Sequence, residues 1–135
     1  MAIMIHYWTN QIEKIMVYYI DKLAFELEYR EPSDGIAKFC ILRIGDSKFM
    51  FASSIFSEDF LDRKDQLVLE QISKRIGSPG PISVYIGMDN IDDYYKQVKN
   101  QLAEIIEPIW DTPWRLRQFS TIDPDGNIAT FFLNT

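Results

Sequence analysis

The sequence predicts an α+β fold built from two βαβββ modules, and three observations lead to this prediction. Residues 12–23 and 91–102 each place apolar side chains at the three-and-four spacing of an amphipathic helix. These two helices superpose at an offset of 79 residues, and the same offset carries residues 3–8 onto residues 83–87. Strand-like segments follow each helix in the same order. Agreement at one offset predicts a duplicated unit of roughly 55 residues.

The first module, residues 1–54, is expected to run strand, helix, then three strands. Asn10 is the predicted N-cap of its helix, with Glu13 three residues later as in a capping box. Polar turn residues at 32–35 and at 45–47 separate the strands that follow. The predicted strands of this module are residues 3–8, 25–31, 37–44 and 48–53.

The second module, residues 82–135, repeats this order. Its tight turn at residues 123–127 contains Gly126, which can take a positive φ. The segment at residues 55–81 connects the modules, and its apolar spacing predicts at least one helix that covers a sheet edge or acts as a lid. We expect residues 1–135 to form one domain. The predicted strands are residues 83–87, 104–109, 114–122 and 128–133.

Composition excludes several classes of site. The chain has 135 residues, of which 47% are hydrophobic and 14% aromatic, so it can form a core without disulfides. Cys40 is the only cysteine, which excludes a disulfide framework and a multi-cysteine zinc site. His6 is the only histidine, which excludes sites that need two imidazoles. Cys40 is expected to be a buried small hydrophobe and not a nucleophile.

The net charge of the chain limits the classes of partner that it can bind. The net charge is −6, whereas a general nucleic-acid binder needs a basic surface. An acidic protein is better suited to a cationic or neutral small ligand. No apolar run approaches the roughly 18 residues of a membrane span, and no signal peptide is visible. We therefore expect a cytoplasmic protein without a nucleic-acid or membrane partner.

Two stretches of the chain resemble a known family. Ile-Glu-Lys at 12–14, Tyr-Tyr at 18–19 and Leu-Ala-Phe at 23–25 are similar to the first helix of the vicinal oxygen chelate superfamily and its exit. Pro-Trp-Arg-Leu-Arg-Gln-Phe at 113–119 and Asp-Pro-Asp-Gly-Asn at 123–127 are closest to the bleomycin-resistance-like branch of this glyoxalase and dioxygenase group. Ala24 and Arg115 stand where glycine is usual in the family.

The resemblance implies a curved mixed sheet around a central cup, with metal-ligand positions on the first and last strand of each module. These positions fall on Met4, Phe51, Ser83 and Thr130. A thioether, a phenyl ring and two neutral hydroxyls are poor ligands for a catalytic divalent cation. We therefore expect no metal and no cofactor, and neither glyoxalase I nor ring-cleaving dioxygenase activity.

Strand alternation then indicates which side chains face the cup. The phenylalanines among them have core packing as an alternative role, and Trp110 and Trp114 have loop anchoring. Arg117 could bind a ligand carboxylate or pair with Glu104 or Glu107. The predicted ligand-binding residues are Met4, His6, Trp8, Phe49, Phe51, Ser83, Tyr85, Trp110, Trp114, Arg117, Thr130 and Phe132.

Three functions are compatible with these residues. The first is a metal-independent binding protein that sequesters an antibiotic or a cationic aromatic compound as a homodimer, which is what the resemblance implies. The second is a lyase, isomerase or dioxygenase-like enzyme in which His6 acts as a general base with Ser83 or Tyr85. The third is a partner-binding subunit whose cup is filled by its own side chains.

Overall fold

The first module comprises one strand, a helical segment and three further strands. The computed structural model describes residues 3–53, 66–80 and 82–135. In this module the four strands form a mixed sheet of order β1-β4-β3-β2, in which β1 is parallel to β4 and the other pairs are antiparallel. Its elements are β1 (Ile5–Thr9), α1 (Ile12–Val17), the π-helix η1 (Tyr18–Lys22), β2 (Glu26–Glu31), β3 (Phe39–Ile44) and β4 (Ser47–Ser53).

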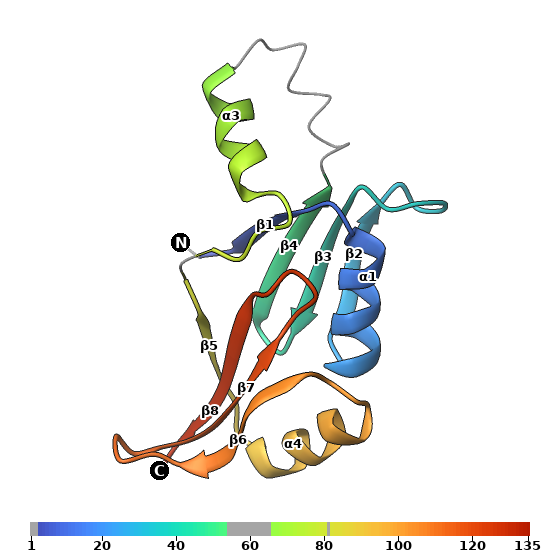
Figure 1. Cartoon of the computed structure of the whole chain (residues 1–135). Coiled ribbons are helices and arrows are strands. Elements are labelled where there is room, and N and C mark those ends of the chain that lie inside the picture. Colours follow the sequence, from blue (N-terminus) through green and yellow to red (C-terminus); the bar gives the residue numbers. More distant parts are fainter. Residues whose placement is uncertain (1–2, 54–65, 81) are drawn as a thin grey trace.

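The second module repeats this topology in a sheet of order β5-β8-β7-β6 (Figure 1). Again the first strand of the module is parallel to the last. The two-module α+β fold predicted from the repeat is therefore confirmed. Its elements are β5 (Val84–Gly87), α4 (Ile91–Asn100), β6 (Ile105–Asp111), β7 (Leu116–Ile122) and β8 (Ile128–Asn134), and α3 (Gln66–Arg75) precedes them.

The first helical segment ends in a π turn that the apolar spacing did not reveal. The amide of Leu23 donates to the carbonyl of Tyr18, and Ala24 then takes a φ of 61°. Leu102 has a φ of 62° at the matching end of α4. The N-cap predicted at Asn10 was one residue too early. In the structure Gln11 is the N-cap of α1, and its side chain makes no capping hydrogen bond. The carboxylate of Glu13 instead accepts a hydrogen bond from the amide of Ala37.

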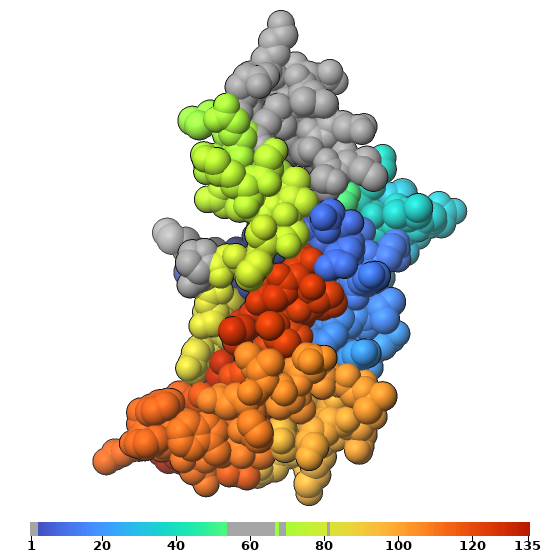
Figure 2. Space-filling model, in the orientation of Figure 1, coloured from blue at the N-terminus to red at the C-terminus, as the bar shows by residue number. Residues whose placement is uncertain are grey.

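The helix-covered faces of both sheets share one hydrophobic core. Tyr19 from the first module and Tyr94 from the second both belong to it. The Tyr19 hydroxyl donates to Asp123 at 2.8 Å, and the Tyr94 hydroxyl donates to the Leu23 carbonyl at 2.8 Å. In Figure 2 the turn between β7 and β8 lies directly against α1. Because the helix-covered faces pack together, the helix-free face of each sheet is turned away from this core.

No helix in the described ranges combines the length and the apolar character that crossing a bilayer requires. The residues between β4 and α3, where the connecting segment begins, lie outside the described part of the chain. The role predicted for the connecting segment, as a lid or as a cover of a sheet edge, therefore stays a prediction. The described end of that segment is fixed beside β1, because the amide of Gly77 donates to the carbonyl of Trp8 at 3.2 Å.

Candidate functional site

The first helix-free face consists of five apolar or aromatic residues from three strands. Register places His6 opposite Met50 and Trp8 opposite Ala52, with β3 next to them. The rings of His6 and Trp8 lie 4.6 Å apart, and His6 meets a third ring at 6.4 Å in an edge-on contact. This first face is made of His6, Trp8, Phe39, Ile41 and Met50.

Desolvation by these neighbours lowers the pKa of His6 below its ordinary value. No carboxylate of a described residue forms an ion pair or hydrogen bond with the imidazole. An imidazole packed at a tilt against an indole is suited to contact a flat ligand. The lack of an orienting carboxylate distinguishes it from the activated base of a catalytic dyad.

A cavity of about 420 Å³ opens beside this face. Its walls include His6 and Trp8 from β1, and Lys74 and Arg75 from the end of α3. Its volume lies within the range of roughly 300–1,000 Å³ that holds small organic ligands. The guanidinium of Arg75 is bonded within α3, to the carbonyl and side chain of Gln71. The cavity thus joins two aromatic rings to a cationic rim.

The lower edge of the first sheet has charges that are internally balanced. Arg43 contacts both Glu26 and Glu28, and Lys48 reaches Glu28 at 2.9 Å. These side chains are partly exposed, so each pair contributes little to stability. They leave little net charge on this part of the face.

The second helix-free face is more polar. Cross-strand register aligns Tyr85, Thr130, Ser120 and Glu107 in one row across all four strands. The next row contains Phe132, Gln118 and Trp110. Glu107 Oε1 accepts hydrogen bonds from the Gln118 amide at 3.0 Å and from the Ser120 hydroxyl at 2.9 Å. We call these seven residues the second face.

Two tryptophans stand at one end of the second face. Trp110 and Trp114 meet edge to face at 5.7 Å, with 39% and 56% of their surfaces exposed. The turn between them is held by the Thr112 hydroxyl, which bonds both the amide and the carbonyl of Leu116. Both indoles therefore present open surface, and their contact with a ligand stays a prediction.

Three predicted residues lie on the wrong face. Phe49 and Phe51 point into the core, with 2% and 0% of their surfaces exposed, so the core alternative holds for both. The reason is that one residue fewer separates Ile41 from its partner Met50 than separates the matching pair Ser120 and Thr130, which shifts β4 relative to the repeat. Met50, not Phe51, is therefore the counterpart of Thr130.

Arg117 is also turned away from the second face. Its guanidinium pairs with Asp92 at 2.9 Å and with Asp111 at 3.2 Å, on the side where α4 packs. The ion-pair alternative therefore holds, with different acids from the two that were expected. These bonds raise the pKa of Arg117 above its ordinary value. Arg117 is not available to a ligand on the second face.

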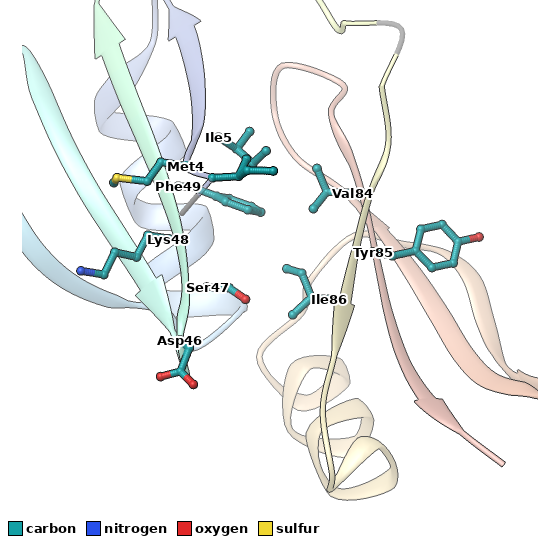
Figure 3. A pocket seen from close by; sticks show the side chains of 10 residues that line it. Met4, Ile5, Asp46, Ser47, Lys48, Phe49, Val84, Tyr85 and Ile86 are labelled. Carbon is teal, nitrogen blue, oxygen red and sulfur yellow. The ribbon is translucent and has the colours of Figure 1, made fainter. Parts of the chain in front are cut away.

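Within one chain the two faces do not meet around a common hollow. A cavity of about 350 Å³ separates the edges of β1 and β5 (Figure 3). Ile5, Val84 and Ile86 project into this gap, whereas Met4 and Tyr85 point away from it in opposite directions. This differs from the expectation that Met4, Ser83 and Thr130 surround one space. The difference follows from the shared core, which turns the helix-free faces outward.

The residues at the four expected ligand positions do not fit a divalent metal. Met4 offers a thioether and Phe51 has no donor atom. The Thr130 hydroxyl is already bonded to Ser120 at 2.7 Å, and Ser83, which directly precedes β5, is exposed. Across residues 3–53, 66–80 and 82–135, no group of three or more His, Cys, Asp or Glu side chains is placed to hold a metal ion.

Sequence reasoning missed several residues of the two faces. Gln118 and Ser120 alternate with Arg117, so assigning Arg117 to the helix side would have identified them. Glu107 has no such signal, because irregularities in the β6–β7 register on both sides of it decide which way it points. The position of Met50 on the first face depends on the number of residues between the paired positions of β3 and β4.

Comparison with known proteins agrees with the motifs. The profile of the Glyoxalase/Bleomycin resistance protein/Dioxygenase superfamily matches residues 3–131. Bleomycin resistance proteins of Geobacillus stearothermophilus and Staphylococcus aureus are each 30% identical over 128 residues, covering 92% of this chain and 89% of theirs.

Solved structures share the fold at lower identity. TioX from Micromonospora sp. ML1 has a TM-score of 0.72 and 17% identity, covering 100% of this chain and 99% of its own. TnmS3, an antibiotic binding protein from Streptomyces sp. CB03234, has a TM-score of 0.66 at 17% identity, with the same coverage. From the matched residues and the paired modules, the chain belongs to the glyoxalase/bleomycin resistance protein/dioxygenase superfamily.

Proposed function

We propose that this protein binds a small organic molecule, without a metal, in a hollow completed by a second copy of the chain. The observation that carries the proposal is the pair of helix-free faces, which both carry aromatic rings, with a small set of polar groups on the second face. Binding sites for small molecules combine apolar walls with a few placed polar groups. The cavity next to His6 and Trp8 is large enough for part of such a ligand.

The need for a second copy follows from the outward orientation of the faces. One chain places rings on both helix-free faces, but these faces point away from each other. A symmetric pair brings the first face of one copy against the second face of the other and does so twice, because a two-fold contact repeats itself. Exposed apolar side chains at the edges of the faces, including Met4, Tyr29 and Tyr85, support such a contact.

The class of ligand is inferred from charge and from relatives. The net charge of −6 favours a cationic or neutral molecule over an anionic one. Relatives at 30% identity are named bleomycin resistance proteins, and one structural neighbour is titled an antibiotic binding protein. The proposed ligand is therefore a planar, cationic antibiotic or a compound of similar chemistry, which the protein sequesters.

The enzymatic alternative depends on the same pairing. His6 and Tyr85 lie on faces that diverge within one chain, so a partner chain would have to bring Ser83 or Tyr85 near the imidazole. No described carboxylate orients His6. The subunit with a filled cup remains the third hypothesis, and the absence of any ligand binding would favour it.

The test is calorimetric titration of chelator-treated protein. Metal-free bleomycin and an uncharged anthraquinone are titrated into the wild type and into Trp8→Ala and Trp110→Ala variants. We expect binding of at least one compound, weakened by about tenfold or more in each variant, as for a buried aromatic contact. Val17→Ala, which truncates an exposed side chain on α1, is the matched control and should bind like the wild type.

Two results would contradict the proposal. The first is the absence of binding to either compound, or binding that neither tryptophan variant alters. The second comes from elemental analysis of the purified protein: a stoichiometric transition metal bound through His6 would show that the site is a metal centre.

A further inference from the structure

The second face contains a carboxylate that is oriented by its neighbours but lacks a counter-charge. Within the described ranges, Glu107 has no cationic side chain at ion-pair distance. On the first sheet, Glu26 and Glu28 are paired with Arg43 and Lys48, and Glu31 accepts a hydrogen bond from the Tyr29 hydroxyl. On the second face, Glu107 is the carboxylate that lacks a cationic partner among the described residues.

Hydrogen positions around Glu107 follow from elementary donor rules. A carboxylate only accepts, so the Ser120 hydroxyl must donate its single hydrogen to Glu107 Oε1. The Thr130 hydroxyl, 2.7 Å from the Ser120 oxygen, must then donate to Ser120. The Gln118 amide nitrogen donates to the same Oε1. The Ser120 and Gln118 hydrogens both point to Glu107 Oε1, while the Thr130 hydrogen points to the Ser120 oxygen. No described group donates to Oε2.

The same rules fix the amide of Gln118. Because its nitrogen faces the carboxylate, its oxygen Oε1 faces the other way, and flipping the amide would place two acceptors together. Gln118 is 3% exposed, and its Oε1 is buried without a hydrogen-bond donor among the described residues. A buried acceptor without a donor is destabilising and is usually satisfied by water or a ligand. Trp110 lies across the strand pair from Gln118 and is partly exposed.

We propose that Glu107 Oε2 and Gln118 Oε1 form an acceptor pair that selects ligands with a cationic N–H donor. An ammonium, amidinium or guanidinium group carries both the charge and the hydrogens that this pair requires. A quaternary ammonium carries the charge without hydrogens, and a hydroxyl carries a hydrogen without the charge. The exposed indoles of Trp110 and Trp114 lie beside the pair, where the aromatic part of the ligand can stack. This inference rests on the proposed binding function and names the chemistry of its ligand.

The test compares three probes that share one ring system. These are 9-(aminomethyl)anthracene, its trimethylammonium analogue and 9-anthracenemethanol, titrated by fluorescence into the wild type, Glu107→Gln and Glu104→Gln. Glu104 is exposed, and its side chain bonds no described group, so Glu104→Gln is the matched control for loss of one charge. We expect the wild type to bind the primary ammonium about tenfold or more tightly than either analogue, since hydrogen bonds to charged groups carry that difference.

Glu107→Gln should abolish this preference while binding of the alcohol stays within about twofold, and Glu104→Gln should keep the preference. Equal affinity of the wild type for all three probes would overturn the inference and leave the binding function standing. An unchanged preference in Glu107→Gln would overturn it as well. If no probe binds the wild type, the inference is overturned, and the titrations with bleomycin and the anthraquinone decide the binding function separately. The wild-type comparison needs no variant, so a variant that does not fold cannot obscure the result.

Discussion

Replacing Tyr19 by phenylalanine is expected to destabilise the protein in a pH-dependent manner. The Tyr19 hydroxyl donates to Asp123 Oδ2 at 2.8 Å, in a site where both residues are buried. The ring itself keeps its contacts with neighbouring phenylalanines, so the substitution removes only the hydroxyl. A hydrogen bond to a buried charge contributes about 1.5–3 kcal/mol. At roughly 3–5 °C per kcal/mol for a domain of this size, the melting temperature should fall by about 5–15 °C.

The sign of the pH dependence follows from Asp123. Burial raises the pKa of this carboxyl above its ordinary value, while the Tyr19 hydroxyl and the amides of Asp125 and Asn127 oppose the rise. Removing the hydroxyl favours the protonated carboxyl and raises the pKa further. The loss of stability is therefore full where Asp123 is ionised, near neutral pH, and becomes smaller as the pH falls through the raised pKa.

Denaturant unfolding of both proteins between pH 4 and neutral pH measures this difference. Tyr95→Phe is the control, because the Tyr95 ring packs on Phe119 and its hydroxyl bonds no described group. The control should unfold like the wild type. A Tyr19→Phe protein as stable as the wild type at neutral pH, or destabilised equally at every pH, would refute the reasoning about Asp123.

Three further predictions concern single side chains. Ala24 and Arg115 have φ values of 61° and 68°, so glycine at either position should raise the unfolding free energy by roughly 0.5–1 kcal/mol; lower stability in denaturant would contradict the strain argument. Burial raises the pKa of the Cys40 thiol to about 12, so iodoacetamide should label it only after unfolding, and rapid native labelling detected by mass spectrometry would show an open site. Arg117→Met should leave the denaturant midpoint close to that of the wild type and ligand affinity unchanged, because the guanidinium is partly exposed and faces α4; weakened ligand binding in a titration would show that Arg117 belongs to the binding site.

Much of the fold was predictable because the duplication leaves matching helices, turns and strand patterns in the two halves of the sequence. Matching helices and turns gave the order of elements, and strand alternation placed His6 and Trp8 on one helix-free face. Alternation also placed Thr130 and Phe132 together on the other. These assignments need only local periodicity within one strand.

The remaining features depend on irregularities that periodicity does not detect. One residue fewer between the paired positions of β3 and β4 than between those of β7 and β8 places Phe51 in the core and Met50 on the first face. Breaks in the β6–β7 register direct Glu107 to the second face. The packing of the two modules also could not be predicted, because it depends on long-range contacts such as the Tyr94 hydroxyl with the Leu23 carbonyl.

The proposed assembly also gives a role to the charge distribution. The first face borders on the cations of Lys74 and Arg75, whereas the second face carries the unpaired carboxylate of Glu107. Opposite charges on the two faces favour their association across a symmetric pair. A ligand between them would meet rings from one copy and the acceptor pair from the other.

Mixing two inactive variants tests most directly whether the site is shared between copies. Trp8→Ala disables the first face and Trp110→Ala disables the second, so neither variant alone retains an intact site. After joint unfolding and refolding at equal concentrations, random pairing should restore about a quarter of the wild-type binding capacity, because half of the pairs contain one intact site of two. Titration with a compound that binds the wild type should find this fraction at wild-type affinity. No recovery in a mixture that exchanges subunits would show that the two faces do not form one site.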